Sequence, residues 1–320
     1  MSDHDHDEHE GHAHSEGHNH SHGGHHHAPA NFGNAFAIGI ALNLAYVMGE
    51  AFYGVIAHSL ALLADAGHNL GDVLGLAGAW LASILSKRRP GGRYTYGLRR
   101  SSILAALANA IVLLIVTGGI AWEGIQRLID PQPVGGFIIM VVAAVGIVIN
   151  GVTALLFMSG RKDDLNIKGA FLHMASDALV ALGVVVAGAI IIWTGWLWLD
   201  PAVSLVVSGI IVAGTWSLLR DSVNFSLDAV PPGLDQAKIA AFLQRLPGVT
   251  EIHDLHIWGM STTETALTVH LVRPGATLDD DMLHHAAEEL KEHFNIAHAT
   301  FQVENGTGAQ LCSLRPDEVV

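Results

Sequence analysis

The sequence predicts a membrane protein with six transmembrane helices, followed by a small cytoplasmic α+β domain. Half of the 320 residues are hydrophobic and only 14% are charged, whereas charged residues make up about a quarter of an ordinary soluble domain. Six apolar stretches each approach the ~20 residues that a helix needs to cross a bilayer. From residue 228 onward the composition becomes that of a soluble domain, so we expect one domain in lipid and one in water.

The first domain is expected to cover residues 34–222. The first two stretches, residues 34–86, contain three acidic residues and no Lys or Arg. The fifth stretch is expected to extend toward Leu165, because His173 lies close to its apolar start. The six apolar stretches run approximately over residues 34–56, 60–84, 102–122, 136–158, 170–193 and 201–219.

The distribution of basic residues predicts the orientation in the membrane. Links on one side are rich in Lys and Arg, whereas the other side carries only Arg127. Since cytoplasmic loops hold the excess of basic residues, both termini are predicted to be cytoplasmic. The basic residues on that side are Lys87, Arg88, Arg89, Arg93, Arg99, Arg100, Arg161, Lys162, Lys168 and Arg220.

The second domain is expected over residues 228–306, with a short tail at 307–320. Apolar periodicity predicts helices at 234–246 and 279–293, and alternation predicts strands at 250–258, 264–272 and 297–304. The resulting order, α-β-β-α-β, is typical of a small α+β domain with its helices on one side of the sheet.

The N-terminal residues 1–30 form a low-complexity tail, and eleven of the first 27 residues are His. Such a segment buries no core, so we expect it to be disordered and to bind metal ions loosely. Cys312 is the only cysteine, which excludes an internal disulfide framework and a four-cysteine zinc site. The net charge of −14 argues against a nucleic-acid partner.

Two His-Asp pairs lie inside predicted spanning helices. His68 and Asp72 in the second helix are four residues apart, as are His173 and Asp177 in the fifth. Residues at this spacing share one helix face, and ionisable groups in the bilayer are costly enough to indicate function. Facing each other, the pairs would offer two imidazole nitrogens and two carboxylate oxygens. The sequence therefore predicts a tetrahedral metal site, for which zinc has the right ligand preferences.

Two further acids lie in the first two helices. Asp65 precedes His68 by one turn, and we expect it to orient a metal ligand. Glu50 has two open interpretations: a hydrogen bond between helices or part of a proton path.

These residues resemble the cation diffusion facilitator family, especially its zinc-exporting branch. The resemblance covers nearly the whole chain after residue 34. It is carried by SLALLADAGHNLGD (59–72), YTYGLR (94–99), residues 166–177, IIWTG (191–195), DSVN (221–224) and HDLHIW (253–258).

The resemblance implies a bacterial inner-membrane homodimer that exchanges cytoplasmic Zn²⁺ for protons by alternating access. It implies that His68, Asp72, His173 and Asp177 form the transport site, and that His68 favours zinc over cadmium. The second domain would have a ferredoxin-like or metallochaperone-like fold. The resemblance implies no enzyme activity and no partner beyond the second copy and the bilayer.

The resemblance also implies a second, regulatory zinc site in the cytoplasmic domain. Its ligands would be His253, His270 and Glu304, with Cys312 as a further candidate donated from the same or the other subunit. A metal site that some relatives have between their second and third helices is not expected here, because residues 87–101 contain no His, Asp or Glu. Weaker candidate ligands are His256, His284, His285, His293 and His298.

Three alternatives remain open. The cargo could be cadmium, cobalt, nickel or iron, because ligand chemistry alone does not choose among them. An intramembrane zinc hydrolase is a second alternative, although the sequence has no His-Glu-x-x-His motif. A non-transporting metal sensor is the third, but it leaves the membrane His-Asp pairs without a role.

Overall fold

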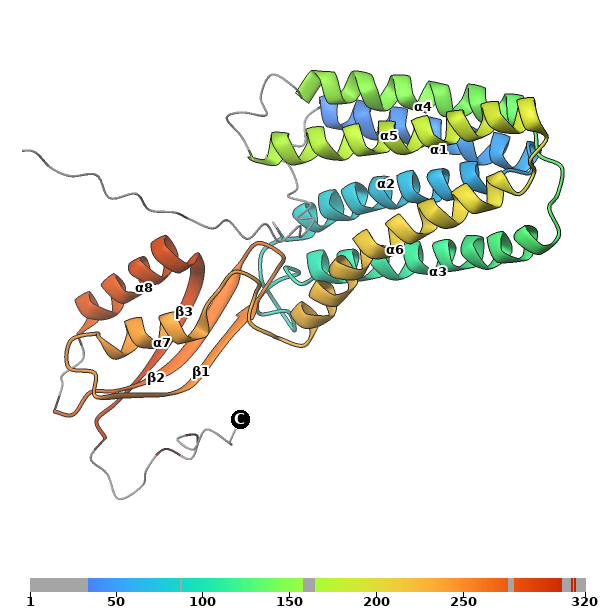
Figure 1. Ribbon diagram of the computed structural model, residues 1–320. Helices are drawn as coiled ribbons and strands as arrows, with labels where there is room; N and C mark the ends of the chain where they lie inside the picture. Colours follow the sequence, from blue (N-terminus) through green and yellow to red (C-terminus); the bar gives the residue numbers. More distant parts are fainter. Residues whose placement is uncertain are drawn as a thin grey trace, which may run out of the picture.

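The computed structural model describes residues 34–86, 88–157, 165–275, 279–306, 312 and 314. Six long helices lie side by side in a bundle, and a small α+β domain follows at one end (Figure 1). We call this end of the bundle the domain end and the opposite end the far end. The bundle helices are α1 (Asn34–Ile56), α2 (Leu60–Ser86), α3 (Ser101–Ile129), α4 (Gly136–Phe157), α5 (Leu165–Thr194) and α6 (Leu199–Ser226).

The bundle confirms the predicted membrane architecture. Helices α2 to α6 each contain a segment long and apolar enough to cross a bilayer, and α1 supplies 23 further residues of apolar helix. The expected extension of the fifth helix is also found, since α5 begins at Leu165. Helices α3 and α6 continue several residues past the predicted apolar stretches, because their hydrogen-bonded turns extend into the polar segments.

The helices form two groups (Figure 1). Helices α4 and α5 pack closely against each other, as do α3 and α6, while α2 contacts α5 only sparsely. A Cβ on Gly188 of α5 would lie 3.0 Å from the backbone oxygen of Gly136 in α4, so glycine permits the close α4–α5 approach. At the far end, α2, α4 and α5 converge on an apolar cluster of Ala57, Ala61, Leu62, Ile139, Ala143, Val184 and Ile191.

The C-terminal domain has the predicted α-β-β-α-β order. Its sheet has strand order β1-β2-β3, with β1 antiparallel and β3 parallel to β2. Both helices pack on one face over a core that includes Leu243, Leu267 and Leu290. Their N-termini are capped by the side chains of Asp235 and Asp279. The elements are α7 (Gln236–Gln244), β1 (Glu251–Gly259), β2 (Thr265–Val272), α8 (Asp280–Phe294) and β3 (Ile296–Glu304).

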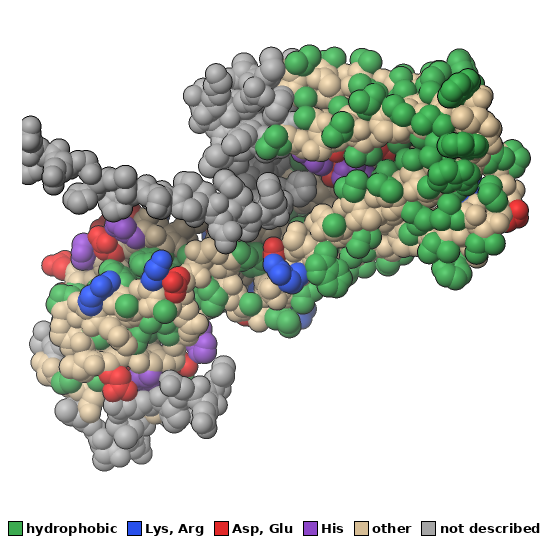
Figure 2. All heavy atoms as spheres, viewed as in Figure 1, with side chains coloured by type: hydrophobic (Ala, Val, Ile, Leu, Met, Phe, Trp, Pro, Cys, Tyr) green, Lys and Arg blue, Asp and Glu red, His purple; other side chains and the backbone are tan. Residues whose placement is uncertain are grey.

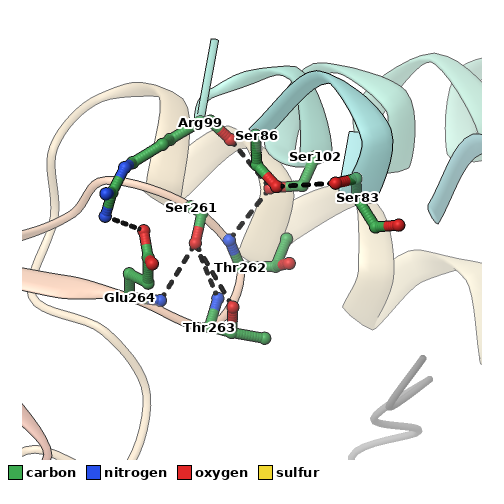
Figure 3. Close-up of polar contacts among 8 residues, drawn as sticks. All are labelled: Ser83, Ser86, Arg99, Ser102, Ser261, Thr262, Thr263 and Glu264. Atoms are coloured by element: carbon green, nitrogen blue, oxygen red, sulfur yellow. Dashed lines mark hydrogen bonds and ion pairs between the residues drawn. The ribbon is translucent and has the colours of Figure 1, made fainter. Parts of the chain in front are cut away.

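The turn between β1 and β2 contacts the start of α3 (Figure 3). Arg99 Nη1 lies 2.5 Å from Glu264 Oε2, and the backbone N–H of Thr262 donates to Ser102 Oγ at 3.1 Å. Nearby, Arg100 forms an ion pair with Asp228. These contacts join the domain to the link between α2 and α3 and to the start of α3.

Candidate metal sites

The two membrane His-Asp pairs meet between α2 and α5. His68 and Asp72 share one face of α2, and His173 and Asp177 share one face of α5, as the four-residue spacing requires. His68 Nε2 lies 3.2 Å from Asp177 Oδ1, and His173 Nε2 lies 3.1 Å from Asp72 Oδ2. The structure thus brings all four predicted residues together, with each imidazole close to the carboxylate of the opposite helix.

The spacing of the four side chains suits a tetrahedral zinc ion. Zinc bonds of about 2.0–2.1 Å place tetrahedral ligand atoms about 3.3 Å apart. The His-to-Asp distances within each helix are 3.8 Å for α2 and 3.6 Å for α5, close to that value. Ligand atoms of His68, Asp72 and Asp177 lie within 4.8 Å of one another, and the rings of His68 and His173 are 6.0 Å apart. A small movement of α5 toward α2 would complete the coordination shell.

The membrane site is partly exposed. The side chains of His68, Asp72 and His173 are 23%, 21% and 31% exposed, whereas that of Asp177 is 4% exposed. Figure 2 shows His and acidic side chains at the bottom of a recess between the α4–α5 pair and α6, in the half nearer the domain end. The apolar cluster of α2, α4 and α5 lies toward the far end, and its residues are no more than 5% exposed.

Asp65 lies near Glu50 of α1 as well as near the metal site. Its carboxyl group interacts with that of Glu50, and its charge acts on His68, so its expected role in orienting a ligand stays a prediction. The α1–α2 hairpin brings residues 50 and 65 to the same depth. Glu50 therefore joins two helices, and both acids are buried.

The second candidate site lies on the sheet face opposite the two helices. His253 on β1 is paired with His270 on β2, and their rings are 5.0 Å apart. Glu304 on β3 approaches both, with its carboxylate oxygens 3.0 Å from His270 Nδ1 and 3.6 Å from His253 Nε2. Cys312 Sγ lies 3.5 Å from His270 Nδ1 in the same chain. One ligand atom from each of these four residues falls within 4.8 Å of the others.

The electrostatics of this cluster suit a cation. Both ring nitrogens of His253 are buried and have no hydrogen-bond partner in the described part of the chain, a costly arrangement that a metal ion would relieve. Burial raises the pKa of Glu304, but hydrogen bonds from Gln302 and Cys312 and the nearby imidazoles outweigh it and lower the pKa. Glu304 is thus held as a carboxylate, the form that binds metal.

Sequence reasoning missed Asp254, whose Oδ2 lies 3.4 Å from His270 Nε2. A β-bulge between His253 and His256, with Asp254 at a positive φ of 51°, brings this carboxylate to the cluster. The alternation of apolar and polar residues along the strand does not predict this bulge. Asp254 is therefore an ion-pair partner of a candidate ligand when His270 is protonated.

The weaker His candidates lie apart from both clusters. His256 Nε2 lies 2.9 Å from Asp254 Oδ1, whereas His270 approaches the other oxygen, Oδ2, of the same carboxylate. His298 packs its ring against Tyr96 of the α2–α3 link. The remaining three, His284, His285 and His293, are exposed on α8.

Comparison with known proteins identifies the family. The cation efflux transmembrane domain matches residues 36–224, more than half of the chain, and the cation efflux protein cytoplasmic domain matches residues 231–306. The chain belongs to the cation efflux family. These proteins are the cation diffusion facilitators, so the chain is a multi-pass membrane protein of metal-cation efflux.

Several bacterial members are similar over most of their length. Zinc transporter ZitB of Escherichia coli is 38% identical, covering 84% of this chain and 86% of the relative. Metal cation efflux system protein CzcD of Cupriavidus metallidurans is 36% identical, covering 88% and 90%. The cadmium, cobalt and zinc/H(+)-K(+) antiporter of Bacillus subtilis is 32% identical, covering 90% and 96%.

Proposed function

We propose that this cation efflux protein exports Zn²⁺ from the cytoplasm in exchange for protons, and that His68, Asp72, His173 and Asp177 bind the transported ion. The observation that carries the proposal is the meeting of two imidazoles and two carboxylates from α2 and α5 at zinc-binding distances. Nitrogen and oxygen ligands in this ratio suit zinc. The names of the ZitB and CzcD relatives support a zinc or metal cargo.

Proton exchange follows from competition for the same ligand atoms. Zinc requires neutral imidazoles and ionised carboxylates, so binding displaces protons. An ordinary His titrates at a pKa of about 6.5, within reach of the pH difference across a bacterial inner membrane. Protons arriving from the acidic exterior would therefore displace zinc, and the neutral cytoplasm would favour its rebinding.

The orientation proposed from the basic residues places the domain end in the cytoplasm. Arg88, Arg89 and Arg93 of the α2–α3 link lie at this end, in agreement with the excess of basic residues expected on the cytoplasmic side. The recess over the metal site lies toward the same end, and the apolar cluster lies toward the other (Figure 2). This arrangement suits a state that loads zinc from the cytoplasm. Release requires α4 and α5 to move against α2, a step that the sparse α2–α5 contact permits.

The cluster in the C-terminal domain is proposed to bind a regulatory zinc ion. His253, His270, Glu304 and Cys312 fit a zinc ion by donor type and spacing, and the buried ring nitrogens of His253 lack another partner among the described residues. The protein is proposed to act as a homodimer in which this ion stabilises the domain pairing. The domain would then influence α3 through Arg99 and Glu264 (Figure 3).

Flux into proteoliposomes with an imposed pH gradient tests the proposed exchange. Zinc should accumulate only when the gradient is present, and addition of a proton ionophore should abolish the accumulation. Equal zinc uptake with and without the gradient would exclude antiport while leaving zinc transport intact. Substitution of cadmium, cobalt, nickel and iron for zinc in the same assay gives the cargo preference.

A further inference from the structure

A buried pair of acids lies beside the metal site and has no role in zinc coordination. Glu50 on α1 and Asp65 on α2 are only 1% and 2% exposed, and their carboxyl groups are close enough to interact. Two ionised carboxylates buried close together without Lys or Arg nearby repel each other, which favours the state in which one of the two carries a proton. The pair therefore holds at least one proton in this arrangement.

The surroundings of Glu50 fix its position and provide no cation. Tyr46 Oη donates to Glu50 Oε1 at 3.0 Å, and Asn69 Nδ2 donates to Glu50 Oε2 at 3.2 Å. A Cβ on Gly146 of α4 would collide with the Tyr46 hydroxyl, so glycine at this position leaves room for the donor. Helix α4 contains no titratable side chain, and residues 34–86 contain no Lys or Arg.

The charges that reach the pair come from the metal site. His68, Asp72 and Asp177 act on Asp65 electrostatically. Helices α3 and α6 also pack against α2, but their titratable residues lie toward the helix ends: Glu123, Arg127, Asp200, Arg220 and Asp221. Arrival of a divalent cation at the metal site is therefore the largest change of charge that the pair experiences.

The pair lies on the exterior side of the metal site in the proposed orientation. Asp65 precedes His68 by three residues, about 4.5 Å along the axis of α2 toward the far end. Glu50 lies six residues before the end of α1 and Asp65 five after the start of α2, so both are at the same depth in the hairpin. A proton that enters from outside reaches this depth before the zinc ligands.

We propose that Glu50 and Asp65 form a proton-binding site that carries one of the exchanged protons. Zinc binding breaks an O–H bond of the pair and releases the proton to water, leaving two carboxylates beside the positive ion. When zinc leaves, a proton from the exterior restores the acid–carboxylate pair. This inference rests on the proposed antiport and assigns part of its proton stoichiometry to residues that do not touch zinc.

The test is the proton-to-zinc ratio of Glu50→Gln, measured in proteoliposomes as the zinc gradient that stops net flux at a fixed pH gradient. The amide keeps the size and hydrogen bonds of the side chain but cannot titrate. The ratio should fall by about one proton per zinc. In the unsubstituted protein each zinc that binds displaces one proton from the pair, and the variant has no such proton to release. Asp65→Asn should lower it equally, and Glu288→Gln, on the exposed face of α8, should leave it unchanged.

An unchanged ratio in Glu50→Gln would overturn the proton-binding role and leave Glu50 as a hydrogen-bonded link between helices. Glu50→Gln could bind zinc without transporting it. In that case the number of protons released per zinc bound is measured instead, on the detergent-solubilised full chain. That count should again be about one lower than in the unsubstituted protein. Should Glu50→Gln fail to fold, the count for Asp65→Asn decides. Zinc flux in the unsubstituted protein that does not depend on the pH gradient would instead contradict antiport itself.

Discussion

The two candidate metal sites use similar ligands on different scaffolds. In the membrane, His68 and Asp72 come from α2 and His173 and Asp177 from α5, two helices with little other contact. In the C-terminal domain, His253 and His270 lie on paired strands of one sheet, and Glu304 follows on the third. The membrane ligands can therefore separate by movement of a helix pair, whereas the sheet holds its three ligands at nearly fixed distances.

This difference indicates different uses for the two ions. A site divided between mobile elements can open to one side and then the other, which a transported ion requires. A site built on a hydrogen-bonded sheet is suited to retain its ion and stabilise one arrangement of the domain. The comparison supports the proposal that the membrane site binds the transported ion and that the site in the C-terminal domain binds a regulatory ion.

Loss of a membrane ligand should have the largest effect. Asp177→Asn removes a charge from the most buried ligand, which lies close to both imidazoles. Since loss of a mere hydrogen-bond partner of a metal ligand costs 10–100-fold in affinity or activity, zinc flux should fall by more than about 100-fold. Asp130→Asn, on the exposed link at the far end, is the matched control and should retain normal flux. Flux within tenfold of normal in Asp177→Asn would show that this pair is structural.

Loss of a domain ligand should change zinc content more than transport. His270→Ala removes the residue that contacts Glu304, Asp254 and Cys312, so the purified protein should bind one zinc fewer per chain. Maximal flux should stay within about threefold, because the coupling between separate sites is typically 1–3 kcal/mol and acts on binding. His284→Ala, on the exposed face of α8, should lose no zinc. Complete loss of flux in His270→Ala would end the distinction between cargo and regulatory ion.

A smaller effect is expected at the contact between the domain and the bundle. Glu264→Gln breaks the ion pair with Arg99, and both side chains are more than a third exposed. Exposed pairs contribute about 0–1 kcal/mol, so the response of flux to domain zinc should weaken by at most about fivefold. Dose-response curves for zinc, with Glu288→Gln as an exposed control, measure this change. An unaltered response would place the connection elsewhere, with Arg100 and Asp228 as the next pair to test.

The smallest effect is a pH dependence of the metal-free domain. Because the pKa of Glu304 is lowered in the folded state, its carboxylate stabilises the fold above the usual Glu range. That contribution is lost as pH falls through the lowered value. Hydrogen exchange of β3 amides in zinc-free protein should therefore accelerate on acidification below the usual Glu range, and less so in Glu304→Gln. The same acceleration in both proteins would assign the pH effect to other groups.

Much of the architecture could be predicted because it depends on local patterns. Apolar length located the helices, alternation located the strands, and four-residue spacing placed each His-Asp pair on one face. The meeting of the two pairs could be inferred because neither alone fills a zinc coordination shell. Their role as zinc ligands remains a prediction.

What the sequence did not reveal depends on nonlocal geometry. The contribution of Asp254 requires a bulge and a left-handed residue in β1, and the position of Cys312 depends on the path of the tail. The contact of Glu50 with Asp65 depends on how the α1–α2 hairpin sets its register. Each of these features joins residues whose spacing carries no periodic signal.

Zinc K-edge X-ray absorption tests most directly whether one zinc is held jointly by α2 and α5. The measurement uses protein without the His-rich residues 1–30 that also carries His253→Ala, His270→Ala and Cys312→Ser, loaded with one zinc per chain. The account predicts a zinc coordination shell without sulfur, with ligands at about 2.0–2.1 Å that include two imidazoles. The number of imidazole ligands should fall to one in either His68→Ala or His173→Ala. A spectrum unchanged by both substitutions would contradict the shared site and the transport scheme built on it.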